Sequence, residues 1–153
     1  KSFPNNMEEI KVEINLIDSH ETLALPYAEE GIRAGFPSPA EEHMMTGIDL
    51  NKELVRHPET TFYARVKGHS MAGVGIDDGD LVVVDKSLDA CTGNYVVACI
   101  DGEFTLKEFR IDESNHCAWL MPANEAYHPI RITEENNFMV WGVVTYVIKK
   151  VYK

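Results

Sequence analysis

Two residues of this sequence, a serine after a glycine and a lysine farther along the chain, could together perform chemistry. Ser70 stands in Gly68-His69-Ser70-Met71, which interrupts the strand-like run 62–67, so a tight turn can project its hydroxyl. A serine hydroxyl becomes a nucleophile at neutral pH only when a base takes its proton. Lys107, in the strand-like run 103–109, is the candidate for that base.

The lysine is expected on a β-hairpin. Asp101-Gly102 stands between two apolar runs, which is a strong signal for a two-residue hairpin turn. In that register Val96 faces Lys107, and Thr105 and Phe109 share the face of the lysine. Desolvation there would disfavour the ammonium form. To serve as a base at pH 7, the pKa of a lysine must fall by roughly three units from about 10.4, which corresponds to about 4 kcal/mol.

His69 is the rival base, because it is the immediate neighbour of Ser70. Adjacent residues of an extended segment point to opposite sides, so His69 is poorly placed to take the proton of Ser70. A serine and a lysine at this spacing are weak evidence when taken alone. Most serines near a glycine are turn residues, and most lysines are solvated.

Three stretches read together carry more information than the pair of residues. They are Gly68-His69-Ser70-Met71, the run 79–85 and the run 101–107. Together they resemble the self-cleaving serine peptidases of the LexA/UmuD family, over about residues 31 to 149. In that family the serine after the glycine turn is the nucleophile and the hairpin lysine its general base. The resemblance therefore implies a serine peptidase in which Ser70 and Lys107 are catalytic.

The string from Gly35 to Ala40 is a candidate substrate within the same chain. Its two prolines favour extended backbone, which is the form that a protease groove accepts. The resemblance places self-cleavage before this string, at Ala34-Gly35. It thereby divides the chain into an N-terminal arm, 1–34, released on cleavage, and a LexA/UmuD-type peptidase domain, 35–153. The same residues can also be a linker with a helix start, because Ser38-Pro39-Ala40-Glu41 forms a capping box.

The resemblance also implies a biological role. Such a chain is a protein of the SOS response to DNA damage, cleaved when it meets the RecA filament on single-stranded DNA. Its trimmed homodimer then serves as subunit of an error-prone translesion polymerase with a UmuC-like Y-family catalytic chain. Two alternatives stay open: a LexA-like binding module whose dyad is idle, and a soluble signal-peptidase-like serine protease that acts on other proteins.

Composition limits the classes of partner. The 25 Asp and Glu residues exceed the 14 Lys and Arg residues, giving a net charge of -11, which argues against direct binding to duplex DNA and favours protein partners. Cys91, Cys99 and Cys117 are odd in number and lack Cys-x-x-Cys spacing, so reduced core thiols are expected rather than disulfides or metal ligands. We expect no metal and no cofactor.

No apolar run is long enough to span a membrane. The longest, 138–148, has only eleven residues and contains Gly142 and Thr145. A signal peptide is not visible either, and we expect a cytoplasmic protein. The long apolar stretch 138–148, with Trp141 and Tyr146 interleaved, predicts a homodimer, since it exceeds what one sheet edge usually leaves uncovered.

The remaining patterns predict mostly strands. Strict alternation over 9–16 indicates an N-terminal strand, whereas 18–30 has no clean period. Short helices are expected at 39–47 and 49–56. Asp77-Asp78-Gly79-Asp80 lacks the ligand spacing of an EF-hand and predicts a turn. Further strands are expected at 81–84, 117–121, 130–132 and 138–148. The expected fold is mainly β, a curved, partly closed, barrel-like sheet of the LexA C-terminal and signal-peptidase type with short N-terminal helices.

Overall fold

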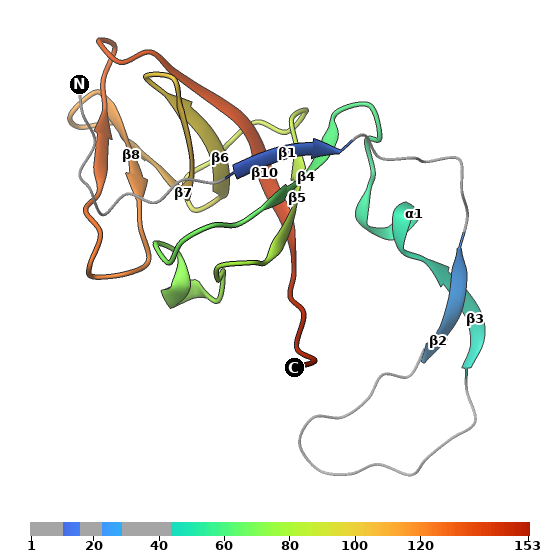
Figure 1. The fold of residues 1–153 in the computed structure, drawn as a ribbon. Helices are drawn as coiled ribbons and strands as arrows, with labels where there is room; N and C mark the ends of the chain where they lie inside the picture. Colours follow the sequence, from blue (N-terminus) through green and yellow to red (C-terminus); the bar gives the residue numbers. More distant parts are fainter. Residues whose placement is uncertain (1–10, 16–22, 29–43) are drawn as a thin grey trace. The chain divides into compact units, whose positions relative to one another are not determined.

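The computed structural model describes residues 11–15, 23–28 and 44–153. These residues divide between two compact units, and each is described by itself. The larger unit is an eight-stranded antiparallel sheet with strand order β1-β4-β5-β10-β6-β7-β8-β9 (Figure 1). The smaller unit holds a two-stranded sheet and a short helix. The mainly β expectation is confirmed.

The strands and helices have the following bounds. The strands are β1 (Lys11–Asn15), β2 (Ala24–Ala28), β3 (Met44–Asp49), β4 (Thr61–Arg65), β5 (Leu81–Asp85), β6 (Tyr95–Ile100), β7 (Glu103–Asp112), β8 (Cys117–Met121), β9 (Ile130–Ile132) and β10 (Phe138–Ile148). The helices are α1 (Leu50–Leu54) and a single 3-10 turn, η1 (Ala72–Val74).

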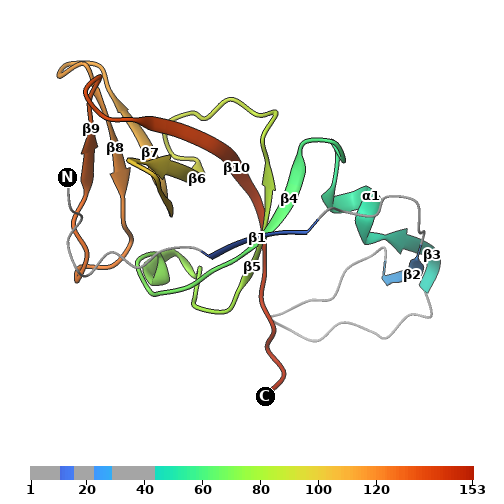
Figure 2. The same cartoon turned by 45° about the horizontal axis from the view of Figure 1, so that its top comes forward.

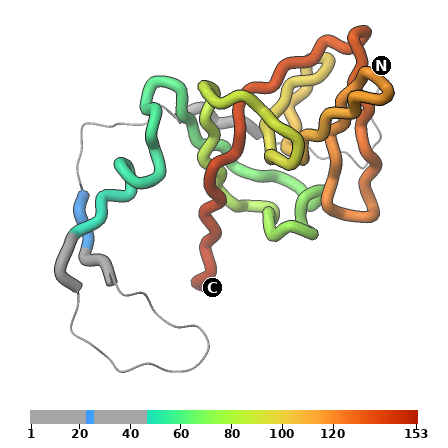
Figure 3. The backbone as a smooth tube through the Cα atoms, turned by 180° about the vertical axis from the view of Figure 1, so that it is seen from behind, coloured from blue at the N-terminus to red at the C-terminus, as the bar shows by residue number. Residues whose placement is uncertain are grey.

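Strand β10 joins the two halves of the large sheet. Its first half, Phe138 to Val143, pairs with β6, and its second half, Val143 to Ile148, pairs with β5. Figures 2 and 3 show it running from the part of the sheet formed by β7–β9 to the part formed by β4 and β5. Register shifts on both sides of Val143 let the strand bend. The sheet is therefore curled but open, because β1 and β9 end it without pairing with each other.

Two apolar clusters form the core, and consecutive residues of β6 and β7 alternate between them. Val97 and Leu106 belong to one cluster, which also takes in Phe62 and Met71. The other contains Val96, Ala98, Ile100, Phe109, Leu120, Ile132 and Val143. This alternation, the period of a strand, buries both faces of the hairpin that carries Lys107.

Gly142 permits the close approach of β10 to β5. A Cβ atom at this position would lie 2.6 Å from Val84 Cγ1 and 3.1 Å from the carbonyl oxygen of Asp85. Any larger residue here would have to push the two strands apart.

The smaller unit departs from the sequence expectation in one place and agrees in another. Residues 44–47 belong to β3, so the helix expected over 39–47 is wrong there, and 39–43 lie outside the described residues. Strand β3 forms because it pairs with β2, whose residues show no periodic pattern in the sequence. Helix α1 is confirmed within 49–56, with the side chain of Asp49 accepting a hydrogen bond from the backbone N–H of Asn51.

The other strand expectations are largely confirmed. Strand β1 falls inside the predicted run 9–16, and β5, β8, β9 and β10 match the expected ranges. Strand β10 was expected at an edge of the sheet, but it lies between β5 and β6. Tyr146, Val147 and Ile148 are nevertheless exposed, so the homodimer stays a prediction.

Candidate active site

The turn that carries Ser70 follows directly from strand β4. The strand ends at Arg65, and Gly68 then adopts φ 95°, a left-handed conformation that favours glycine. The backbone N–H of Gly68 donates to Asp78 Oδ1 at 2.8 Å, which ties this turn to the acidic turn 77–80. The predicted turn at 77–80 is confirmed, and Lys149 Nζ binds the carboxylates of Asp77 and Asp80 at 2.7 and 2.6 Å.

A second segment holds the far side of the serine turn. The N–H of Ala123 donates to the carbonyl oxygen of Ser70 at 2.7 Å, and the N–H of Gly73 donates to the carbonyl oxygen of Ala123, also at 2.7 Å. Asn124 Nδ2 donates to the carbonyl oxygen of His69 at 2.8 Å. Because its backbone is tied on two sides, the turn presents Ser70 in a fixed position.

The hairpin that carries Lys107 has the register expected from the sequence. Val96 pairs with Lys107 and Ile100 pairs with Glu103 across the turn Asp101-Gly102. Both turn residues have positive φ, 48° and 86°, as a type I′ turn requires. Lys107 is only 1% exposed, although lysines are almost never fully buried unless they have partners.

Ser70 and Lys107 meet in the folded chain. Lys107 Nζ lies 2.9 Å from Ser70 Oγ, 2.8 Å from Thr105 Oγ1 and 3.1 Å from the carbonyl oxygen of Leu106. Ser70 is buried, whereas His69 is exposed, as expected for neighbours that point to opposite sides. The structure thus brings the two predicted residues into direct contact across a sequence separation of 37.

The three acceptors suit either protonation state of the amine. An ammonium group has three N–H donors and no acceptor, so it can donate to all three oxygens. A neutral amine has two N–H donors and one lone pair. If these donors stay on Thr105 and Leu106, the lone pair faces Ser70, whose hydroxyl then becomes the donor. This arrangement can remove a proton from the serine.

Thr105 was expected on the same face as the lysine, but its hydrogen bond was not foreseen. The Thr105 side chain is fully buried, and its hydroxyl contacts the amine of Lys107. Thr105 stands two residues before Lys107 in the sequence. The signal in the sequence is the i, i+2 spacing, because residues at that spacing share one face of a strand.

A second polar cluster, not singled out from the sequence, joins β5 to the start of β4. His57 Nδ1 lies 2.6 Å from Asp85 Oδ2, and the hydroxyls of Ser87 and Thr60 donate to Asp85 Oδ1 at 2.7 and 3.0 Å. Burial alone would raise the pKa of Asp85, but the hydrogen bonds from His57, Ser87 and Thr60 outweigh it and lower the pKa to about 2.

This cluster contains the residue types of a Ser-His-Asp triad without its geometry. The Ser87 hydroxyl lies 3.2 Å from Nδ1 of His57, the same ring nitrogen that contacts Asp85. A triad needs the serine and the carboxylate on different nitrogens of the imidazole. The cluster therefore joins the segment before β4 to the end of β5 and does not activate Ser87.

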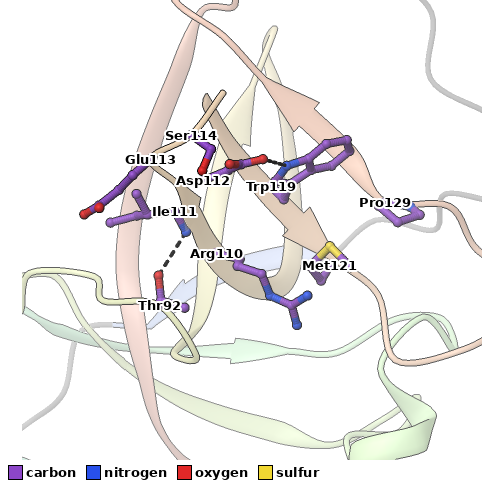
Figure 4. A pocket seen from close by; sticks show the side chains of 9 residues that line it. All are labelled: Thr92, Arg110, Ile111, Asp112, Glu113, Ser114, Trp119, Met121 and Pro129. Atoms are coloured by element: carbon purple, nitrogen blue, oxygen red, sulfur yellow. Dashed lines mark hydrogen bonds between the residues drawn. The ribbon is translucent and has the colours of Figure 1, made fainter. Parts of the chain in front are cut away.

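An open pocket of about 680 Å³ lies elsewhere, on β7 and β8 (Figure 4). Its lining includes Arg110, Asp112 and Trp119, and it includes neither Ser70 nor Lys107. Trp119 Nε1 donates to Asp112 Oδ2 at 3.2 Å. The hydrogen bond from the Asn115 side chain, followed by this bond from Trp119, lowers the pKa of the Asp112 carboxyl. Arg110 Nη2 donates at 2.8 Å to Oε2 of Glu108, a residue outside this lining.

Several further expectations concern side chains outside the dyad. All three cysteines are free thiols, but Cys91 is exposed and Cys99 and Cys117 are half-buried, so the expected core placement is wrong for Cys91. Trp141 packs edge-on against Phe62 and Phe104.

Within the described residues, no helix is long and apolar enough to cross a membrane. The proposed scissile residues Ala34 and Gly35 lie outside the described residues.

Comparison with known proteins gives matches over most of this chain. The family model for peptidase S24-like proteins matches residues 26–145. Protein MucA of Salmonella typhimurium is 42% identical over 124 residues, covering 80% of this chain and 83% of MucA. Protein SamA of the same species is 41% identical, covering 82% of this chain and 85% of SamA. The LexA repressor of Thermobifida fusca is 40% identical, covering 78% of this chain and 45% of the repressor.

Proposed function

Because this chain belongs to the peptidase S24-like family, we propose that it is a serine peptidase that cuts its own backbone, with Ser70 as nucleophile and Lys107 as general base. One observation carries the proposal: the buried amine of Lys107 lies 2.9 Å from the hydroxyl oxygen of Ser70. A general base must be within hydrogen-bond reach of the proton that it removes, and this distance meets that requirement without rearrangement.

The reaction proceeds by acyl transfer. Neutral Lys107 takes the hydroxyl proton as Ser70 Oγ attacks the carbonyl carbon of Ala34. The resulting ammonium then donates a proton to the leaving amine of Gly35, and an ester joins Ser70 to Ala34. Water, deprotonated by the neutral amine, hydrolyses that ester and frees the carboxylate of Ala34.

The burial of Lys107 supports its role as a base. Removing an ammonium group from water disfavours the charged form, and Lys107 is 1% exposed. We therefore expect its pKa to lie below that of an exposed lysine. Because the neutral amine is the active form, cleavage should be slow in acid and become faster as pH rises.

The cut at Ala34-Gly35 is the one that the family resemblance implies, and the proline-rich string Gly35 to Ala40, which favours the extended backbone of a protease substrate, supports it. It yields residues 35–153 as the trimmed form. We propose that this form acts, as a homodimer in the cytoplasm, with a UmuC-like Y-family polymerase in error-prone synthesis past DNA damage. The RecA filament on single-stranded DNA stimulates the cut. The net charge of -11 supports protein partners rather than duplex DNA.

A panel of variants tests the assignment. Ser70→Ala and Lys107→Ala should each abolish the 35–153 fragment when the purified chain is incubated at alkaline pH. His69→Ala is the matched control, since it changes the neighbouring exposed side chain and should cleave like the parent. Cleavage at the parental rate in Ser70→Ala or Lys107→Ala would refute the catalytic role of that residue. Loss of cleavage in His69→Ala would favour His69 as the general base.

The same panel separates the alternatives. An idle binding module would give no fragment in any variant. A protease that acts only on other proteins would leave its own chain whole but cut a second polypeptide that carries the string around Ala34-Gly35, and only when Ser70 is present.

A further inference from the structure

Both described strands on the N-terminal side of the proposed cut pair with strands on its C-terminal side. Strand β1 pairs antiparallel with β4 in the large sheet, with Lys11 opposite Arg65 and Asn15 opposite Tyr63. Strand β2 pairs antiparallel with β3, from Ala24 opposite Asp49 to Ala28 opposite Met44. Among the residues that the structure describes, these pairings lie on either side of the bond Ala34-Gly35, and its hydrolysis leaves them intact.

The pairing of Ala28 with Met44 sets the connectivity around the cut. Ala28 is the last residue of β2 and Met44 the first residue of β3, and the two are partners in one ladder. The bond Ala34-Gly35 lies in the sequence between them, within 29–43. A break between these positions turns an intramolecular hairpin into two chains that still share the same backbone hydrogen bonds.

We propose that the fragment 1–34 stays bound to 35–153 after the cut, held by β1 along β4 and by β2 along β3. The position of the break rests on the proposed function. The two attachments belong to one short fragment, so when one strand detaches, the other keeps it at high local concentration. Departure of the fragment is then a second event, separate from hydrolysis.

Retention has a consequence for the strand that leads to Ser70. Strand β4 pairs with β5 on one side and with β1 on the other, and β1 is the outermost strand of the sheet. As long as β1 remains, Tyr63 and Arg65 of β4 have partner residues on that side. Hydrolysis alone therefore leaves β4 covered, and only departure of the fragment turns it into an edge strand.

The test supplies the cut independently of Ser70. A recognition sequence for a foreign protease is inserted between Ala34 and Gly35 of the full chain carrying Ser70→Ala, and the protein is cut with that protease. Size-exclusion chromatography at about 10 µM with intact-mass analysis should find both fragments in one peak, separating only in denaturant. A native peak that contains 35–153 without 1–34 overturns the proposal.

Paired proline variants identify what holds the fragment. Consecutive N–H groups of a strand point in opposite directions, and proline has no N–H to donate. The variant Ile14→Pro with Asn15→Pro places two prolines at the end of β1 where Asn15 lies opposite Tyr63, so it should weaken the pairing with β4. Retention should weaken by about tenfold or more. The matched pair Asp18→Pro with Ser19→Pro, between the two strands in sequence, should retain the fragment.

Equal retention in both proline variants would refute the role of β1. Failure of the parent chain to cut itself would count against the proposed function alone, because the foreign protease makes the same break without the dyad.

Discussion

Replacing Thr105 by valine should shift the pH dependence of self-cleavage to lower pH. The Thr105 hydroxyl lies 2.8 Å from Lys107 Nζ and is fully buried, and valine keeps the shape of the side chain while removing this acceptor. A hydrogen bond to a charged donor contributes about 1.5–3 kcal/mol, and one to a neutral donor about 0.5–1.5 kcal/mol. The ammonium form therefore loses about 1–1.5 kcal/mol more than the amine. That difference corresponds to a pKa lower by about one unit.

The assay is the rate at which the purified full chain disappears, measured from pH 6 to 11 by gel or intact mass. The midpoint of the Thr105→Val profile should lie about one pH unit below that of the parent. Its plateau rate should be lower, because the lone pair of the amine is less firmly directed at Ser70. Thr105→Ser keeps a hydroxyl at the same position and should keep the parental midpoint.

The result that refutes this reasoning is a Thr105→Val midpoint that stays unchanged or moves to higher pH. Either outcome would mean that the Thr105 hydroxyl does not favour the ammonium form, and that the 2.8 Å contact does not set the protonation of Lys107.

Three further predictions concern stability and assembly. The pKa of Asp85 is lowered from 3.8 to about 2, so its ionisation stabilises the fold above pH 3.8 and loses that effect as pH falls toward 2. The difference in unfolding free energy between the parent and Asp85→Asn, measured by denaturant titration, should shrink by about 2 kcal/mol between pH 5 and pH 2; a constant difference would refute it. Gly142→Ala places a Cβ atom 2.6 Å from Val84 Cγ1 and should cost about 1–3 kcal/mol by the same titration, and an unchanged midpoint would show that β10 can move aside. Sedimentation at micromolar concentration should find a dimer, given the exposed Tyr146, Val147 and Ile148, and a monomer would contradict that expectation.

The local geometry of the candidate site could be predicted from the sequence because each of its two parts depends on neighbouring residues. Asp101-Gly102 sets the turn and thereby the pairing of Val96 with Lys107, and Gly68 permits the turn that presents Ser70. These signals act within a few residues and need no knowledge of the rest of the chain. The contact between Ser70 and Lys107 joins two such local features. Their residue types and spacing were weak evidence that they meet, and the resemblance to a known family strengthened it.

What the sequence did not predict depends on partners that are distant in the chain. Strand β3 replaced a helix over 44–47 because it pairs with β2, whose Pro26 and lack of period hide its strand character. Gly47 is the local hint, since a Cβ atom there would lie 2.9 Å from Ala24 Cβ. The contact between His57 and Asp85 likewise spans 28 positions and has no local signature.

We propose that Lys107 in its neutral form activates Ser70 against the bond Ala34-Gly35 of the same protein. The most direct measurement is intact-mass analysis of the purified full chain during incubation at a series of pH values. We predict two products, ending at Ala34 and beginning at Gly35, whose rate of formation rises from pH 7 toward pH 10 until unfolding intervenes. Products from another bond, or a rate that stays flat from pH 7 to 10 with Ser70 and Lys107 both present, would contradict the account.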